Sequence, residues 1–220
     1  MSGAAGTATG ASGPRSGRAI VFDFGGVLFR WRPAALVGQV LAHRIAPETP
    51  PEHWVREVFQ AYGGDWGAFD RGTIEVPALV RRIAARTGLA EADVQALVDA
   101  VPDELSPIPD TVAWLTRLQA EGWPLHFLSN MPEPYAQHLE RTHAFLGQFR
   151  SGVFSSRVQH VKPEPDIFVR AAAHYGRAPS QLLLLDDHAP NIAAARAAGW
   201  QAILFTDAEQ AEAQMQAMAW

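Results

Sequence analysis

Asp23, Ser129 and Asn130 have residue types and positions that suit chemistry on an anion. Asp23 stands near the end of the apolar run Ala19 to Phe24, where an ionised carboxylate is costly unless a cation or a metal compensates its charge. Ser129 and Asn130 end a second apolar run and offer a hydroxyl and a backbone amide to an anion. Taken alone, Asp23 is explained equally well as a turn cap, and an ordinary turn is the better explanation of the other two.

Lys162 and the acidic pair Asp186 and Asp187 add a cation and a candidate metal site. Lys162 is the only lysine among the 18 basic residues, and its compact ammonium suits a position between a carboxylate and a phosphate better than a flat guanidinium does. Asp186 and Asp187 follow the apolar segment Leu182 to Leu185, and a hard cation such as Mg²⁺ is the simplest way to keep both acids ionised. The alternatives are a surface lysine and a solvated acidic turn.

Apolar segments alternate with amphipathic segments through most of the chain. The expected strands are Ala19 to Phe24, Pro124 to Ser129, Leu182 to Asp186 and Gln201 to Phe205, with Gly152 to Ser155 as a weaker candidate. The expected helices are Thr111 to Ala120, Pro134 to Thr142, Asp166 to His174 and Asn191 to Ala198. This alternation predicts an α/β fold, with a Rossmann-like parallel sheet covered by helices on both faces. The polar groups above would then meet at the edge formed by the carboxyl ends of the strands.

The stretch from about Pro33 to Pro107 departs from this alternation, because it holds helical patterns and no convincing strand. Its expected helices are Leu36 to Ile45, Glu52 to Tyr62, Val76 to Thr87 and Glu91 to Val101. A helical insert after the first strand would lie over the carboxyl edge of the sheet and act as a lid. We therefore expect a flexible leader at residues 1–17, a core made of residues 18–32 and 107–220, and a helical cap at residues 33–106.

The composition of the chain limits the kinds of molecule that it is expected to bind. The formal net charge of -5 and the pI near 5.9 create no basic field that would concentrate nucleic acid or anionic lipid. The absence of cysteine excludes disulfides, thiolate metal sites and cysteine nucleophiles. No apolar run approaches the ~20 residues that span a bilayer. We expect a cytoplasmic protein with a small-molecule partner and neither nucleic acid nor membrane as a partner, while the oligomeric state stays open.

Together these residues resemble the haloacid dehalogenase-like superfamily over nearly the whole chain after the leader. VFDFGGVL resembles its first motif, FLSN its second, VKPEPDIF its third and LLLLDDHAPNIAAARAAGW its fourth. The resemblance implies a phosphatase that acts on a small phosphate ester, with Asp23 as the nucleophile that is transiently phosphorylated. Ser129 and the amide of Asn130 would hold the phosphoryl oxygens, and Lys162 would neutralise Asp23 and the phosphate.

The same resemblance implies a Mg²⁺ cofactor and exposes one departure from the family pattern. Asp23, Asp187 and the backbone carbonyl of Gly25 would bind the ion directly, and Asp186 would bind it directly or through water. Most phosphatases of the family carry a second aspartate at the position of Gly25 as general acid and base. FDFGGVL most resembles a branch with glycine there, which includes bacterial phosphatases of glucose 1-phosphate, so a sugar phosphate is one expected substrate class.

Three alternatives share part of this constellation. A 2-haloacid dehalogenase has the aspartate nucleophile, the Ser-Asn pair and the lysine but needs no metal, and the acidic pair therefore favours phosphoryl transfer. A signalling receiver domain has its acidic pair first in the chain, whereas Asp186 and Asp187 come late. A binding protein that has lost catalysis stays open because of Gly25.

The insert is expected to select the leaving group. Its first candidates for this role are Asp65, Trp66, Asp70 and Arg71. Trp31 is a further candidate beside the substrate. His188 follows the acidic pair and either lines the site or, more simply, occupies the start of a helix.

Overall fold

The computed structural model describes residues 17–218 and 220, so the leader expected at residues 1–17 lies outside the described residues apart from Gly17. Within the described residues, one sheet of five parallel strands has the order β3-β2-β1-β4-β5. The strands are β1 (Ala19–Phe22), β2 (Leu125–Ser129), β3 (Ser151–Phe154), β4 (Leu182–Asp186) and β5 (Gln201–Leu204). All five expected strands are therefore present, including the weaker candidate, and the α/β fold is confirmed.

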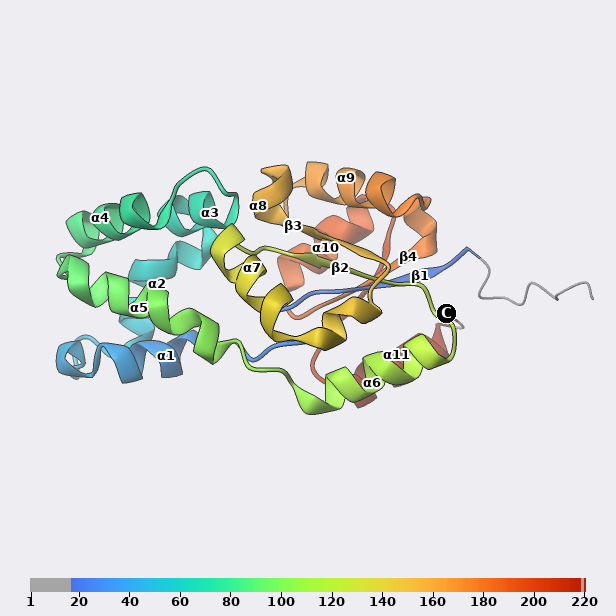
Figure 1. Ribbon diagram of the computed structural model, residues 1–220, viewed down its shortest axis with the longest axis horizontal. Helices are drawn as coiled ribbons and strands as arrows, with labels where there is room; N and C mark the ends of the chain where they lie inside the picture. Colours follow the sequence, from blue (N-terminus) through green and yellow to red (C-terminus); the bar gives the residue numbers. More distant parts are fainter. Residues whose placement is uncertain (1–16, 219) are drawn as a thin grey trace, which may run out of the picture.

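Both faces of the sheet are covered by helices (Figure 1). The core helices are α6 (Pro109–Ala120), α7 (Glu133–Thr142), α8 (Ser155–Val158), α9 (Pro165–Tyr175), α10 (Ala189–Ala197) and α11 (Ala208–Ala217). Residues of α6, α7 and α11 pack on one face, whereas residues of α9 and α10 pack on the other. Because both faces are buried, the strands are almost continuously apolar instead of alternating.

Side chains of one strand divide between these two layers. Ile20 and Phe22 of β1 join the cluster that contains Trp114 of α6, and Ala19 and Val21 join the opposite cluster. Successive residues of a strand point to opposite faces, so four consecutive apolar residues hold both layers together. The chain leaves the sheet after β1 at Asp23, which is itself buried.

The insert after β1 is helical, as expected. It contains α1 (Pro33–Val40), α2 (Pro51–Phe59), α3 (Gly64–Asp70), α4 (Val76–Thr87) and α5 (Glu91–Glu104). Figure 1 shows these helices together, beside the carboxyl ends of the strands. The two chain segments that lead into and out of the insert lie side by side, since Arg30 N donates to Ser106 O at 2.8 Å and Ile108 N to Leu28 O at 2.8 Å.

Three details of the insert differ from the sequence-based expectations. The helix expected over Glu52 to Tyr62 ends at Phe59, because Gln60, Ala61 and Tyr62 adopt left-handed φ angles of 50°, 50° and 63°. The last helix continues past Val101, through Pro102, to Glu104. Helix α3 was not expected, since its seven residues include two glycines. It nevertheless carries side chains into the site.

Short 3₁₀ turns complete the described chain. They span Ala42–Arg44, Gln60–Tyr62, Ala144–Gln148 and Pro179–Gln181. Across the part of the chain that the structure describes, no helix combines the length and the apolar character that crossing a membrane requires.

Candidate active site

The residues predicted to carry chemistry converge on the carboxyl edge of the sheet. Asp23 follows β1, Ser129 ends β2, Asp186 ends β4, and Lys162 lies in the segment that precedes α9. One pocket at this edge is lined by Asp23, Gly25, Ser129, Asn130, Lys162 and Asp187. Asp186 lies directly behind this lining with no exposed surface. Parallel strands bring together residues that are far apart in the sequence, as the topology predicts.

Lys162 is the centre of the charged part of this pocket. Its Nζ lies 2.9 Å from Asp23 Oδ1 and 2.5 Å from Asp186 Oδ2, and only 1% of its side chain is exposed. Burial alone would lower the pKa of Lys162, but the two carboxylates outweigh burial and raise it. Burial raises the pKa of Asp23, while the Lys162 ammonium opposes that shift. The ammonium therefore stays charged and holds the Asp23 carboxylate in a fixed place.

Asp186 is saturated with hydrogen bonds. Besides Lys162, it accepts bonds from the backbone N of His188 at 2.9 Å and from Nδ2 of Asn191, at 3.0 Å to Oδ1 and 3.1 Å to Oδ2. Asn191 was missed by the sequence reasoning, although it stands five residues after Asp186, in the first turn of α10. These contacts make Asp186 the residue that positions Lys162.

A divalent cation fits the acidic end of the pocket. One carboxylate oxygen each of Asp23, Asp186 and Asp187 lies within 4.8 Å of the other two. Desolvation of Asp187 and the adjacent charge of Asp186 raise the pKa of Asp187, although the Lys162 ammonium opposes the shift. Three oxygen ligands at this separation are of the kind that Mg²⁺ prefers.

Asn130 has a second role that its sequence position did not reveal. Its side-chain Oδ1 accepts a hydrogen bond from Lys162 N at 2.8 Å, and its Nδ2 donates to Lys162 O at 2.9 Å. The amide side chain thus binds both backbone groups of Lys162, while Ser129 beside it is 1% exposed. The segment that carries the lysine is in this way fixed to the end of β2.

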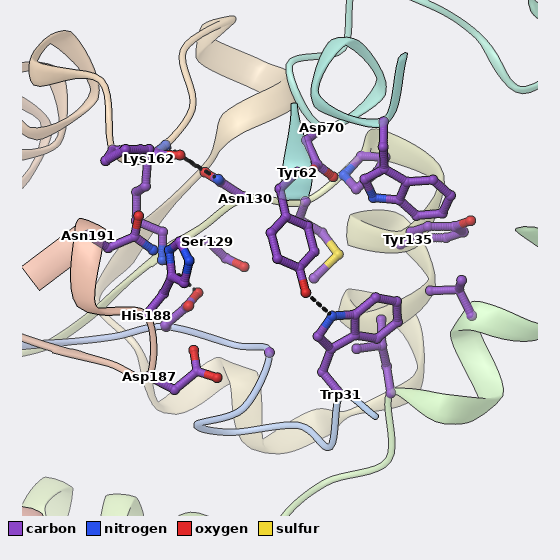
Figure 2. A pocket seen from close by; sticks show the side chains of 18 of the residues that line it. Trp31, Tyr62, Asp70, Ser129, Asn130, Tyr135, Lys162, Asp187, His188 and Asn191 are labelled. Carbon is purple, nitrogen blue, oxygen red and sulfur yellow. Dashed lines mark hydrogen bonds and ion pairs between the residues drawn. The ribbon is translucent and has the colours of Figure 1, made fainter. Parts of the chain in front are cut away.

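The opposite side of the pocket is aromatic and apolar. The aromatic and apolar residues that line the pocket include Trp31, Ala61, Tyr62, Trp66, Val101, Leu105, Met131, Pro132 and Tyr135. Figure 2 shows Trp31, Tyr62, Asp70 and Tyr135 on one side and Lys162, Ser129, Asn191, His188 and Asp187 on the other. Two donors of this wall are already used, because Trp31 Nε1 donates to Tyr62 Oη at 2.8 Å and Tyr135 Oη donates to Val98 O at 2.9 Å.

Asp70, at the end of α3, is the one carboxyl that the described residues contribute to this wall. The residue is 4% exposed, and among the described residues no hydrogen bond or ion pair involves its carboxyl group. Burial, together with the negative charge of Asp23, raises the pKa of Asp70 to about 8. A carboxyl with such a pKa is largely protonated at neutral pH and can donate a proton.

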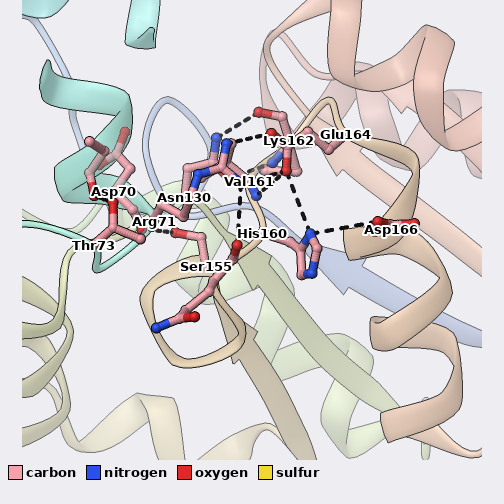
Figure 3. Close-up of polar contacts among 12 residues, drawn as sticks. Asp70, Arg71, Thr73, Asn130, Ser155, His160, Val161, Lys162, Glu164 and Asp166 are labelled. Carbon is pink, nitrogen blue, oxygen red and sulfur yellow. Dashed lines mark hydrogen bonds and ion pairs between the residues drawn. The ribbon is translucent and has the colours of Figure 1, made fainter. Parts of the chain in front are cut away.

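Contacts between α3 and the core hold Asp70 over the pocket (Figure 3). The backbone carbonyl of Asp70 accepts a hydrogen bond from Ser155 Oγ at 2.5 Å. The next residue, Arg71, forms an ion pair with Glu164, two residues after Lys162, and donates from Nη1 to Gln159 O at 3.2 Å. The end of α3 is therefore attached to the segment that carries Lys162.

The insert's four candidates divide into two groups. Trp66 and Asp70 line the pocket, whereas Asp65 and Arg71 are not among its lining residues. Asp65 lies 3.5 Å from Arg86 Nε instead. Of the two further candidates, Trp31 lines the pocket, and His188 both lines it and precedes the first residue of α10.

The sequence of the chain is similar to that of known hydrolases. A sequence model of the haloacid dehalogenase-like hydrolases matches residues 18–199. The sesquiterpene phosphatase astK of Aspergillus oryzae is 25% identical over 191 residues, which cover 86% of this chain and 90% of that enzyme. The phosphoglycolate phosphatase of Escherichia coli K12 is 34% identical over 98 residues, which cover 44% of this chain and 39% of that enzyme.

Solved structures show the same fold. One is a wild-type haloacid dehalogenase (HAD) family enzyme from Bacteroides thetaiotaomicron in complex with magnesium and inorganic phosphate, with a TM-score of 0.63 and 20% identity over 84% of this chain and 92% of that chain. Another is the L-2-haloacid dehalogenase from Xanthobacter autotrophicus with chloropropionic acid covalently bound, with a TM-score of 0.59 and 18% identity over 84% of this chain and 76% of that chain. At these identities the similarity to the solved structures shows the fold alone.

Proposed function

The chain belongs to the haloacid dehalogenase-like hydrolase family, whose sequence model covers residues 18–199, and we propose that it is a magnesium-dependent phosphatase of small phosphate monoesters. The observation that carries this proposal is the buried contact of 2.9 Å between Lys162 Nζ and Asp23 Oδ1, beside an acidic cluster that suits a cation. A phosphate dianion needs both the ammonium and the cation, whereas the carboxylate substrate of a dehalogenase needs no added acidic pair.

In the proposed mechanism, Asp23 is the nucleophile. Its carboxylate oxygen bonds to phosphorus as the ester oxygen departs, and water then hydrolyses the resulting aspartyl phosphate. The hydroxyl of Ser129 and the backbone amide of Asn130 bind the phosphoryl oxygens, and Lys162 lies between the nucleophile and the phosphate charge. The Asn130 side chain and Asp186 act through Lys162, because both hold it in position.

The proposed metal ligands are Asp23, Asp187 and the backbone carbonyl of Gly25, with Asp186 as a ligand through water. Direct ligation by Asp186 is the weaker alternative, because its oxygens already accept bonds from Lys162, Asn191 and the backbone of His188. A bound Mg²⁺ would offset the negative charge of the carboxylates and the phosphate.

We further propose that residues 33–106 act as a cap over a core made of residues 18–32 and 107–220. Tyr62, Trp66 and Asp70 of the insert line the same pocket as Asp23, which supports this division. The insert would then exclude water and contact the leaving group, while the core binds the phosphate.

The substrate class has three candidates. The first motif resembles that of sugar-phosphate phosphatases, and the two sequence relatives act, by their names, on a sesquiterpene phosphate and on phosphoglycolate. The leaving groups of these substrates differ in charge and polarity. The residues of the pocket wall that would contact the leaving group can therefore discriminate between the three classes.

Hydrolysis of 4-nitrophenyl phosphate by the purified protein tests the proposed activity. We expect turnover with Mg²⁺ and none in excess chelator. After rapid quenching of the reaction, we also expect a peptide containing Asp23 to carry one phosphoryl group. Asp23→Asn should retain the fold and lose at least ~1000-fold in rate, equivalent to ~4 kcal/mol of activation free energy. Release of halide from 2-chloropropionate in the presence of chelator would establish the dehalogenase instead, and phosphate-ester binding without turnover would establish a binding protein.

A further inference from the structure

Among the described residues, the wall opposite the phosphate site offers no lysine or arginine to a leaving group. Lys162 is the only lysine or arginine among the described residues that line the pocket, and its ammonium is already bound by Asp23 and Asp186. The pocket also contains the acids Asp70 and Asp187. A second anionic group on the substrate would therefore find no lysine or arginine of its own among these lining residues.

Two of the donors on this wall are already used and are not available to the hydroxyls of a sugar. The Trp31 indole donates its N–H to Tyr62, and the Tyr135 hydroxyl donates its proton to a backbone carbonyl. Each sugar hydroxyl that is buried there and finds no partner would cost roughly 1–3 kcal/mol. Burial of apolar surface of a leaving group at the same place is favourable instead.

From this lining, and resting on the proposed phosphatase function, we propose that the leaving group of the substrate is uncharged and apolar or aromatic. It would contact the lining residues Trp31, Tyr62, Trp66, Leu105 and Met131. The phosphate alone then binds to the polar side of the pocket. Phosphoglycolate and polyhydroxylated sugar phosphates are thereby poor substrates.

A series of n-alkyl phosphates from methyl to hexyl isolates this contact. Their alcohols from ethanol onward are almost equally basic, so the chemical step is nearly constant while apolar area grows. We expect kcat/KM to rise about fourfold per methylene, the equivalent of ~0.8 kcal/mol per buried CH₂. Hexyl phosphate should exceed both glucose 6-phosphate and 5-carboxypentyl phosphate, which has the same reach with a terminal carboxylate, by at least roughly tenfold.

Calorimetric binding of methyl- and hexylphosphonate to the Mg²⁺-loaded protein separates this inference from the proposed activity. If no ester is hydrolysed but hexylphosphonate binds much more tightly, the phosphatase proposal fails and the apolar wall stands. Equal affinities, or tighter binding of 5-carboxypentylphosphonate, overturn the inference. Tyr62→Ala should reduce the preference for hexyl over methyl phosphate, whereas the matched control Tyr62→Phe, which keeps the ring, should preserve it.

The buried carboxyl of Asp70 can supply a proton that the first motif lacks. Gly25 has no side chain, so the position that usually supplies a proton in this family is empty. Asp70 faces the same pocket from α3, and the contacts of its backbone with Ser155 and of Arg71 with Glu164 hold it there. From this arrangement we infer that Asp70 is the general acid and base of the reaction.

The proton balance is complete with this residue alone. As the Asp23 oxygen bonds to phosphorus and the ester bond breaks, the departing oxygen takes the Asp70 proton and leaves as an alcohol. The Asp70 carboxylate then takes a proton from the water that attacks the aspartyl phosphate, and the starting state returns. The other titratable groups that line the pocket are Asp23, Asp187, Lys162, His188, Tyr62 and Tyr135.

Of these groups, only His188 competes for the role of proton donor. Burial raises the pKa values of Tyr62 and Tyr135, which makes both phenols weaker acids. Lys162 is held as a cation by two carboxylates, and Asp187 belongs to the proposed metal site. The experiment must therefore distinguish Asp70 from His188.

Single-turnover rates of Asp70→Asn on two kinds of ester make this distinction. Departure of 4-nitrophenolate needs no proton, so its rate should change little, whereas an alkyl phosphate should lose about 100-fold or more. Asp70→Glu should recover part of the alkyl rate, and His188→Asn should not show the selective loss. Equal losses on both esters, or none, refute the inference. Absence of turnover in the wild type on every ester refutes the phosphatase itself.

Discussion

The α-carbon of Gly26 lies directly against the carboxylate of Asp187. A β-carbon at Gly26 would stand 2.0 Å from Asp187 Oδ2, far inside van der Waals contact, and the glycine has a φ of +72°. The Gly-Gly of the first motif thus makes room for an acid that belongs to the fourth motif. This contact couples the turn after β1 to the proposed metal site.

Gly26→Ala should therefore displace Asp187 and weaken Mg²⁺ binding. Gly88→Ala is the matched control, because Gly88 has a φ of +75° and a β-carbon added there would meet nothing within 4 Å. Both variants should lose about 1 kcal/mol of stability from the left-handed backbone, but only Gly26→Ala should need more Mg²⁺ for half-maximal activity. Identical Mg²⁺ titrations would show that the contact does not serve the metal.

Lys162→Arg should be almost as inactive as Lys162→Ala. The ammonium lies between two carboxylates with 1% of the side chain exposed, and a planar guanidinium does not fit that compact space. We expect both variants to retain their circular dichroism spectrum and to lose most turnover of 4-nitrophenyl phosphate. Recovery of most activity by arginine would mean that charge alone suffices.

The core of the site was predictable because chain order and topology determine it. Asp23, Ser129 and Asp186 stand at or just beyond the ends of apolar runs, and parallel strands bring such ends to one edge. Lys162 was identifiable because it is the only lysine in an arginine-rich chain. Each of these residues is recognisable from its local sequence, and the parallel sheet then brings the residues close together.

The apolar wall was less predictable because tertiary packing builds it. Tyr62 reaches the pocket from a run of three left-handed residues, a conformation that is uncommon for glutamine, alanine and tyrosine. Asn191 and the side chain of Asn130 act through Asp186 and Lys162, so their roles appear only when those partners are in place. Arg71 resembled a substrate ligand in the sequence, but it pairs with Glu164.

Asp70→Asn should stabilise the metal-free protein in a manner that depends on pH. The ordinary pKa of an aspartate is 3.8, and burial raises that of Asp70 to about 8. Between these values the folded protein holds a proton that the unfolded chain has released, so stability falls as pH rises. The Tm of Asp70→Asn minus that of the wild type should thus be small at pH 4 and largest near pH 8. A difference that is constant over this range would show that Asp70 is ionised in the folded protein.

Restoring the family's usual acid at Gly25 should compensate for the loss of Asp70. A β-carbon at Gly25 would lie 3.6 Å from Trp31 Cβ, an ordinary contact, and its φ is outside the left-handed region, so the backbone and the β-carbon of Gly25→Asp fit there. In the Asp70→Asn background, it should return part of the lost rate on hexyl phosphate and leave the rate on 4-nitrophenyl phosphate almost unchanged, because only the alkoxide needs a proton. In the wild-type background it should add little, since Asp70 already donates.

Gly25→Asn in the same background is the control for this rescue. It has the size of the aspartate without an acidic proton, so it should restore nothing on the alkyl ester. Recovery by both residues would attribute the effect to packing against Trp31. Recovery by aspartate alone would place two alternative proton donors, one following the first strand and one in the inserted helix α3, at the same departing oxygen.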